Sequence, residues 1–216
     1  MSFEGENGFE LLLIRHGVTD SNAGGVLQGH LPVPLNETGR QQARQLTQRL
    51  SKWNPSIRTL ISSDLVRAMQ TADPIAAELK LEPIYDSAWR ERMPGEFQGK
   101  AVGEIKMWDA ATGHLTPPGA EPVQAMRRRV SDALSDLPRR FANRDPVAVI
   151  THGGVIRTIC WLFKEGELPL DQPQIDEIEI VGNCSIWQLY WNGHAWRINC
   201  ANDTSHLTTL SDADTG

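Results

Sequence analysis

The sequence predicts an α/β fold, a three-layer α/β/α sandwich built around a mostly parallel central sheet. Short apolar runs at residues 11–14 and 147–150 are typical of strands that are buried on both faces, as in parallel sheets. Such runs alternate with longer segments of helical periodicity, which favours parallel strands connected by helices. The chain is expected to form one domain, 1–216, with residues 1–8 frayed.

The first strand is expected at residues 10–15, which are almost entirely apolar. Residues 38–53 then show helical periodicity, since Leu46 and Leu50 lie one turn apart, and Thr38 is a candidate N-cap. The alternation therefore begins with one strand and one amphipathic helix.

A second strand is expected at residues 58–62, followed by a helix at 65–80. Asp64 is the expected cap of this helix, and Pro74 should kink it. A short strand at 84–85 ends the first half of the chain.

The middle of the chain has weaker signals. Residues 99–111 are weakly helical, and residues 112–122 form a loop rich in glycine and proline. Residues 123–142 are expected to form a helix with a basic face, which Pro138 should break early.

The central strand is expected at residues 147–151, with a helix at 155–164 behind it. The expected strands of the tail are residues 177–181, 185–190 and 195–198. Asn192-Gly193 separates the last two and is a strong hairpin signal.

Composition excludes several classes of protein. The net charge of −6 argues against a nucleic-acid-binding protein, which would carry a basic excess. No apolar run reaches 18 residues and no leader is visible, so neither a membrane partner nor a signal peptide is expected. The three cysteines form no CxxC pair, which favours free thiols and a cytoplasmic location.

Two histidines follow apolar strands. Arg15-His16-Gly17 ends the first strand, and His152 ends the central one. Ligands of α/β sheets bind outside the carboxyl ends of the strands, so both imidazoles can point at one ligand. Imidazole can act as a nucleophile and guanidinium matches phosphate oxygens, which predicts chemistry on a phosphoryl group.

Further motifs follow these histidines in a fixed order: Leu27-Gln28-Gly29, Gly39-Arg40-Gln41, Ser62-Ser63-Asp64-Leu65-Val66-Arg67-Ala68, Arg90-Glu91-Arg92 and Thr151-His152-Gly153-Gly154. This ordered set resembles the histidine phosphatase superfamily, which has the phosphoglycerate-mutase-like fold. The resemblance extends over residues 10–207, and bacterial phosphatases are among the family members that the chain resembles.

The resemblance implies roles for individual residues. His16 is the nucleophile that accepts the phosphoryl group, and a backbone carbonyl near Gly17 is expected to orient its ring. Arg15 and Arg67 are expected to clamp the phosphoryl oxygens, with His152 as a further donor.

Three further positions are assigned with alternatives. Glu91 is implied as the general acid and base, although Glu96 could serve instead. Asn22 and Gln28 are candidate neutral donors to the substrate. The alternative for Asn22 is a simple turn residue, and the alternative for Gln28 is a loop residue.

No metal and no cofactor are expected. His30, His114, His194 and His206 have no spacing typical of metal ligands, so they are interpreted as loop or structural residues. Arg127-Arg128-Arg129 is interpreted as a solvated helix face.

The favoured function is hydrolysis of small phosphorylated metabolites through phosphohistidine. A cofactor-dependent phosphoglycerate mutase is the first alternative, although residues 100–122 look too short for the insertion usual in mutases. A non-catalytic module that binds phosphorylated ligands is the second. The physiological substrate and the formation of a homodimer are left open.

Overall fold

The computed structural model describes residues 8–104, 116–172 and 181–208 of the protein. Within these residues, six strands form one sheet in the order β3-β2-β4-β1-β5-β6. The strands are β1 (Phe9–Arg15), β2 (Thr59–Ser62), β3 (Ile84–Tyr85), β4 (Val147–Thr151), β5 (Ile186–Trp191) and β6 (Trp196–Asp203). The first four strands pair in parallel and the last two pair antiparallel, so the sheet is mixed and mostly parallel, as predicted.

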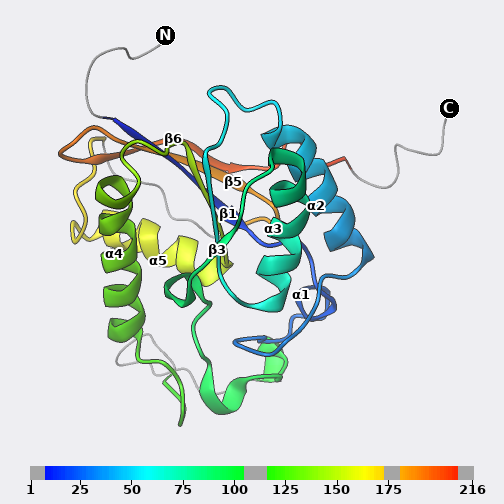
Figure 1. Ribbon diagram of the computed structural model, residues 1–216. Helices are drawn as coiled ribbons and strands as arrows, with labels where there is room; N and C mark the ends of the chain where they lie inside the picture. The colour runs from blue at the N-terminus through cyan, green and yellow to red at the C-terminus, as the bar shows by residue number, and fades with distance from the viewer. Residues whose placement is uncertain (1–7, 105–115, 173–180, 209–216) are drawn as a thin grey trace, which may run out of the picture.

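Helices cover both faces of this sheet (Figure 1). The α-helices are α1 (Asp20–Ala23), α2 (Glu37–Leu50), α3 (Val66–Leu79), α4 (Val123–Arg140) and α5 (Gly153–Lys164). Three short 3₁₀ turns accompany them: η1 (Ser87–Trp89), η2 (Gly95–Phe97) and η3 (Val102–Glu104). Because α4 and α5 lie on one face and α2 and α3 on the other, the predicted α/β/α layering is confirmed.

The residues of β1 show why the sheet is buried on both sides. Successive side chains of a strand point to opposite faces. Leu11 and Leu13 pack in the core that includes α4 and α5 residues, whereas Leu12 and Ile14 pack in the core under α2 and α3. All four are at most 1% exposed, so the strand had to be continuously apolar.

Both predicted helix caps are wrong. Asn36, and not Thr38, caps α2, since its side chain accepts a hydrogen bond from the Gly39 backbone. No side chain caps α3, because the Asp64 carboxylate is bound to Arg90 instead.

Neither internal proline ends its helix early. Pro74 lies inside α3, and Pro138 lies in the last turn of α4, which continues to Arg140. The predicted break at Pro138 is therefore wrong.

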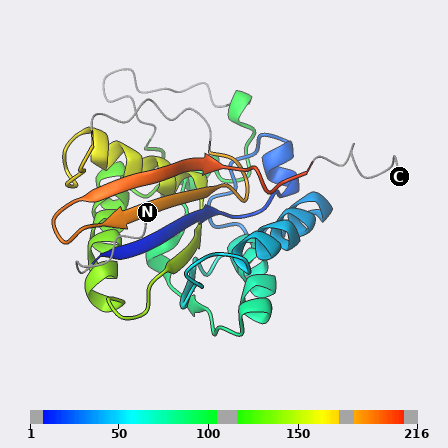
Figure 2. The same cartoon turned by 90° about the horizontal axis from the view of Figure 1, so that it is seen from above.

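The remaining segments are described only in part. The predicted helix at 99–111 is represented by η3 alone, and residues 105–111 lie outside the described residues, as do 112–115 of the loop and 177–180 of the tail strand. The predicted hairpin is confirmed, with Gly193 at a φ of 95° in its turn. Figure 2 shows β1, β5 and β6 side by side at this edge of the sheet.

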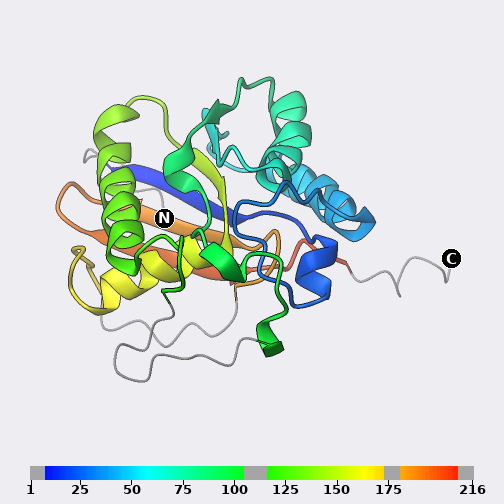
Figure 3. The same cartoon turned by 90° about the horizontal axis from the view of Figure 1, so that it is seen from below.

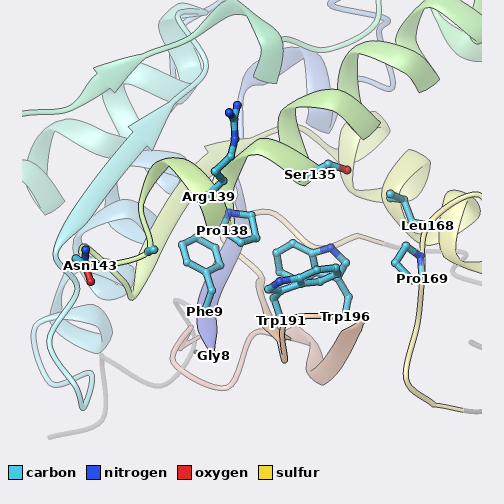
Figure 4. Close-up of a pocket in the computed structure, with 12 residues that line it drawn as sticks. Gly8, Phe9, Ser135, Pro138, Arg139, Asn143, Leu168, Pro169, Trp191 and Trp196 are labelled. Atoms are coloured by element: carbon cyan, nitrogen blue, oxygen red, sulfur yellow. The ribbon is translucent and has the colours of Figure 1, made fainter. Parts of the chain in front are cut away.

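A cavity of about 580 Å³ lies near the amino end of β1, where Phe9, Trp191 and Trp196 contribute aromatic walls (Figure 4). Among the described residues that line it, the one arginine, Arg139, is paired with Asp136. The residues singled out from the sequence lie beyond the carboxyl ends of β1 and β4 instead. Among the described helices, none is long and apolar enough to cross a membrane.

Candidate active site

The two predicted histidines meet where β1 and β4 end. Arg15 pairs with Thr151 in the register of these parallel strands, so His16 and His152 leave the sheet side by side. The His16 amide donates to the Thr151 carbonyl at 2.9 Å, which continues the ladder by one residue. As a result, the two imidazole centroids are 5.1 Å apart.

The His16 ring is held in one orientation. Its Nδ1 lies 2.7 Å from the Gly17 carbonyl oxygen, the contact expected from the sequence, so Nδ1 carries the proton that is donated. The other nitrogen, Nε2, then has a free lone pair and accepts a hydrogen bond from Arg67 Nε at 3.2 Å. Burial, followed by the charges of Arg67 and Arg15, lowers the pKa of His16 well below 6.5. This imidazole is therefore neutral at physiological pH.

Arg67 is a buried cation next to the His16 ring. It lies in the first turn of α3, and its Nη2 donates to the Gly29 carbonyl at 2.8 Å. Burial lowers the pKa of Arg67 to about 10, so the guanidinium stays charged at neutral pH. Its fixed charge beside Nε2 suits binding of an anion.

Arg15 and His152 each carry a polar atom without a partner. The Arg15 guanidinium donates through Nη1 to the Val181 carbonyl, but its Nε is buried and has no hydrogen bond among the described residues. His152 is completely buried, with Nε2 2.8 Å from Ser63 Oγ and with Nδ1 unpartnered in the described part of the chain. Burial and the charge of Arg67 lower the pKa of His152 well below 6.5.

Asn22 and Gln28 come from the segment after β1. Both line the cavity, and both amide oxygens accept hydrogen bonds from Thr19. Asn22 also completes a capping box at the start of α1, so it is a turn residue as well as a wall of the cavity. The amide NH₂ groups are the atoms of these side chains that remain available as donors.

The Glu91 carboxylate lies at the start of α5. Its Oε2 accepts from the Gly154 amide at 2.9 Å, and its Oε1 accepts from the Arg92 amide at 2.8 Å. A Cβ at position 154 would be 2.0 Å from Oε1, so glycine is required for this approach. The alternative, Glu96, is exposed on η2 and does not line the cavity.

The segment around Glu91 is held by Arg129 and His30, to which the sequence assigned no role in the site. Arg129 donates to the carbonyls of Ala88 and Arg90, at 2.8 and 3.0 Å, and forms a two-point ion pair with Glu121. The interpretation of 127–129 as a solvated face is therefore wrong for Arg129. His30 contacts the Glu91 carbonyl oxygen at 2.8 Å through its Nε2. These contacts join segments far apart in sequence, so no local pattern could reveal them.

A cavity of about 530 Å³ opens in front of His16. Its charged lining residues are Arg15, Arg67, Arg92, Arg127, Arg157 and Glu91. His152 is not a lining residue, but its ring contacts that of His16, which is one. A backbone bridge between Val26 and Ala101 joins the segment after α1 to the segment between η2 and η3 (Figure 3). Within the described residues, no three His, Cys, Asp or Glu side chains are grouped to hold a metal.

Comparisons with known proteins show which family this chain resembles in sequence and fold. The family match concerns the chain as a whole: a model described as the histidine phosphatase superfamily (branch 1) matches residues 11–204. Phosphoglycerate mutase-like protein 4 of Arabidopsis thaliana is 36% identical over 210 residues, which cover 92% of this chain and 86% of that protein. The metal-independent phosphoserine phosphatase of Arabidopsis thaliana is 30% identical over 211 residues, 93% of this chain and 84% of that protein. A mycobacterial glucosyl-3-phosphoglycerate phosphatase in complex with VO3 aligns with a TM-score of 0.75 and 27% identity, over 91% of this chain and 100% of that chain.

Proposed function

The chain belongs to the histidine phosphatase superfamily (branch 1), and from that premise we propose that it hydrolyses small phosphate monoesters through a phosphohistidine intermediate. The observation that carries the proposal is the state of His16, a buried and neutral imidazole whose Nε2 lies beside charged Arg67. Relatives named as a phosphoserine phosphatase and a glucosyl-3-phosphoglycerate phosphatase support ester hydrolysis as the class of reaction.

In the first step, Nε2 of His16 attacks the phosphorus atom. A P–N bond forms while the ester P–O bond breaks. Arg15 and Arg67 offset the negative charge on the three non-bridging oxygens. The Nε of Arg15, which has no partner among the described residues, donates a hydrogen bond to one of these oxygens. His152 adds a further donor, and Asn22 and Gln28 contribute neutral amide donors.

Glu91 moves the proton in both steps. Its carboxyl group gives a proton to the leaving alkoxide, which departs as the alcohol. The carboxylate then accepts a proton from the water that attacks phosphohistidine, so that the P–N bond breaks and phosphate leaves. His16 returns to its neutral form, and Glu91 returns to its protonated form.

The reaction as proposed needs no metal and no cofactor. Buried arginine side chains supply the positive charge that a metal ion supplies in other phosphatases. The three thiols, Cys160, Cys184 and Cys200, are free, and a reducing compartment such as the cytoplasm suits them. Burial raises the pKa of Cys160 and of Cys184 to about 12, so neither is a competing nucleophile.

Substitution of the nucleophile tests the proposal. In His16→Ala no other group can carry the phosphoryl group, so turnover of p-nitrophenyl phosphate should fall by about three orders of magnitude or more. Acid quenching should trap acid-labile, alkali-stable phosphate on the wild type and none on the variant. The exposed turn residue His194 offers a matched control, and His194→Ala should retain full turnover. Activity of His16→Ala near the wild-type rate would refute the proposal.

Mutase activity is the second candidate, because relatives include proteins named as probable phosphoglycerate mutases. A mutase must keep phosphohistidine from water while the bound intermediate reorients in the site. Incubation with 3-phosphoglycerate and 2,3-bisphosphoglycerate distinguishes the two candidates. Isomerisation faster than phosphate release from any ester would favour the mutase, and binding without turnover would favour a non-catalytic module.

A further inference from the structure

The two peptide units that follow His16 are held by side chains from three distant segments. The Gln42 side chain of α2, the Thr71 hydroxyl of α3 and the Asn183 amide before β5 each form a hydrogen bond with one of these peptide units. None of the three side chains lines the cavity in front of His16, so they act on the nucleophile only through its backbone.

The first peptide unit, between His16 and Gly17, is held on both sides. Asn183 Nδ2 donates to the His16 carbonyl oxygen at 2.9 Å, and the Gly17 amide donates to Thr71 Oγ1 at 3.0 Å. The Thr71 hydroxyl donates in turn to the Arg67 carbonyl at 2.7 Å, so its oxygen is left to accept. Thr71 is completely buried and ties the His16 turn to the helix that carries Arg67.

The second peptide unit, between Gly17 and Val18, is held by Gln42. The Oε1 of Gln42 accepts from the Val18 amide at 3.0 Å. The Gly17 carbonyl of the same unit faces the Nδ1 of His16 at 2.7 Å. The C=O and N–H groups of a trans peptide lie in one plane and point in opposite directions, so a partner that fixes the N–H also fixes the carbonyl. Gln42 therefore sets the direction of the oxygen that orients the nucleophile.

These contacts form a chain of hydrogen bonds. The chain runs from the Gln42 oxygen through the Gly17–Val18 peptide to the Nδ1 proton of His16. Hydrogen bonds in a chain polarise one another, so the bond at the Val18 amide makes the Gly17 carbonyl a better acceptor. A better acceptor at Nδ1 favours the tautomer with its lone pair on Nε2 and raises the basicity of that nitrogen. Nε2 is the atom that attacks phosphorus in the proposed reaction.

Two glycines allow α2 to approach the His16 turn this closely. Gly39 lies in the first turn of α2, three residues before Gln42 and on the same face of the helix. A Cβ at Gly39 would lie 2.0 Å from the Val18 carbonyl oxygen, and a Cβ at Gly17 would lie 2.7 Å from the Gly39 carbonyl oxygen. The start of α2 therefore packs directly on the turn, which brings Gln42 within reach of the Val18 amide.

We propose that Gln42 and Thr71 are positioning residues for the nucleophile. Gln42 fixes the tautomer of His16, and Thr71 holds the turn that carries it. This assignment rests on the proposed phosphatase function, because attack on phosphorus needs one ring nitrogen that is unprotonated and held in place. Loss of either contact should slow the attack without weakening the binding of phosphate, whose charge is offset by Arg15 and Arg67.

Nearly isosteric substitutions remove each acceptor. Gln42→Met and Thr71→Val should lower the rate of phosphohistidine formation from p-nitrophenyl phosphate about tenfold or more, as measured by rapid acid quench. The inhibition constant of inorganic phosphate should stay within about twofold of the wild-type value, because neither residue lines the cavity. Gln42→Glu and Thr71→Ser keep an oxygen acceptor and should restore the rate to within about threefold of the wild type.

The neighbouring residue Gln41 provides a matched control on the same helix. Its side chain makes no hydrogen bond to a described residue, so Gln41→Met should keep the wild-type rate. Circular dichroism of each variant checks that α2 and α3 remain folded.

The ¹⁵N NMR spectrum of histidine-labelled protein gives a readout that does not depend on turnover. The chain has six histidines, and the His16 signals are those absent from His16→Ala. In phosphate-free buffer, the wild type should show a protonated Nδ1 and an unprotonated Nε2 for His16. In Gln42→Met the two shifts should move toward each other, because the second tautomer becomes populated, and Gln42→Glu should restore them.

The outcomes separate this assignment from the proposed function. Unchanged His16 shifts in Gln42→Met would overturn the fixing of the tautomer, and a wild-type rate in either Gln42→Met or Thr71→Val would overturn the role of that residue. Equal losses in Gln42→Met and Gln42→Glu, or in Thr71→Val and Thr71→Ser, would also overturn it. A wild type that hydrolyses no ester, but whose His16 shifts depend on Gln42, would overturn the phosphatase and leave the positioning of His16 standing.

Discussion

Mild acid should destabilise this fold through the two buried histidines at the ends of β1 and β4. Both His16 and His152 have pKa values far below 6.5 because they are buried beside Arg67, whereas in the unfolded chain each returns to about 6.5. The unfolded state therefore binds more protons as the pH falls below 6.5, and the free energy of unfolding falls. The contribution is fully present above that pH and is lost progressively below it. Between pH 7.5 and 5.5, each histidine should lower the free energy of unfolding by about 1.4 kcal/mol, which is about 2.8 kcal/mol for the pair.

Urea unfolding of the wild type and of His16→Ala at the two pH values measures this effect. The variant should lose about 1.4 kcal/mol less than the wild type between pH 7.5 and 5.5. The buffers should contain no phosphate, because an anion bound at the arginines would oppose the effect. Burial also lowers the pKa of His206, but that contribution is the same in both proteins and cancels in the difference. The exposed residue His194 provides the control His194→Ala, which should behave as the wild type does. Equal pH dependence in the wild type and in His16→Ala would refute the account of a buried, neutral nucleophile.

Three further predictions concern the acid and the source of positive charge. Glu91→Gln should lose about a hundredfold or more of its kcat on alkyl phosphates and much less on p-nitrophenyl phosphate, whose leaving group needs no proton; equal losses would mean that Glu91 only positions the ligand. Gly154→Ala should displace the Glu91 carboxylate and lower kcat on alkyl phosphates by about a hundredfold. The control Gly103→Ala, whose Cβ would meet nothing within 4 Å, should keep the wild-type rate. EDTA should leave turnover unchanged, and loss of activity that Zn²⁺ or Mg²⁺ restores would contradict the arginine-based site.

The sequence predicted those parts of the fold that depend on local periodicity. The strand at 147–151 was predicted with its observed ends, and the hairpin at Asn192-Gly193 was also found, because a continuous apolar run and a turn signal are local features. The helix caps were predicted wrongly, because a polar side chain next to a helix end can bind a partner from a distant segment instead of the helix backbone. Asp64 has the chemistry of a cap, but Arg90, far along the chain, binds its carboxylate at two points.

The site shows the same division. His16, Arg67 and Glu91 could be found because each stands in a recognisable motif. Asn183 was assigned no role in the site, although its side chain donates to the His16 carbonyl at 2.9 Å. Arg129 was assigned to the surface from its basic neighbours, and only the packing of α4 against the Glu91 segment reveals its contacts. Residues that act through the backbone of distant segments leave no pattern in a single sequence.

Two groups of arginines near the candidate site differ in the groups that hold them. Arg90 and Arg129 are held by the carboxylates of Asp64 and Glu121, which cancel their charge and fix the fold around Glu91. Arg15 and Arg67, which we propose bind the phosphoryl group, are held by backbone carbonyls instead.

Carbonyl partners preserve the charge that the chemistry needs. Arg67 donates to the carbonyls of Gly29 and Leu31, and Arg15 donates to that of Val181. A carbonyl oxygen orients a guanidinium without neutralising it, whereas a carboxylate would compete with the phosphoryl group for the same donors. The uncancelled charge also lowers the pKa of His16, together with burial, and so keeps the nucleophile unprotonated. One choice of partner therefore serves both requirements of phosphoryl transfer, a cationic binding site and a neutral imidazole.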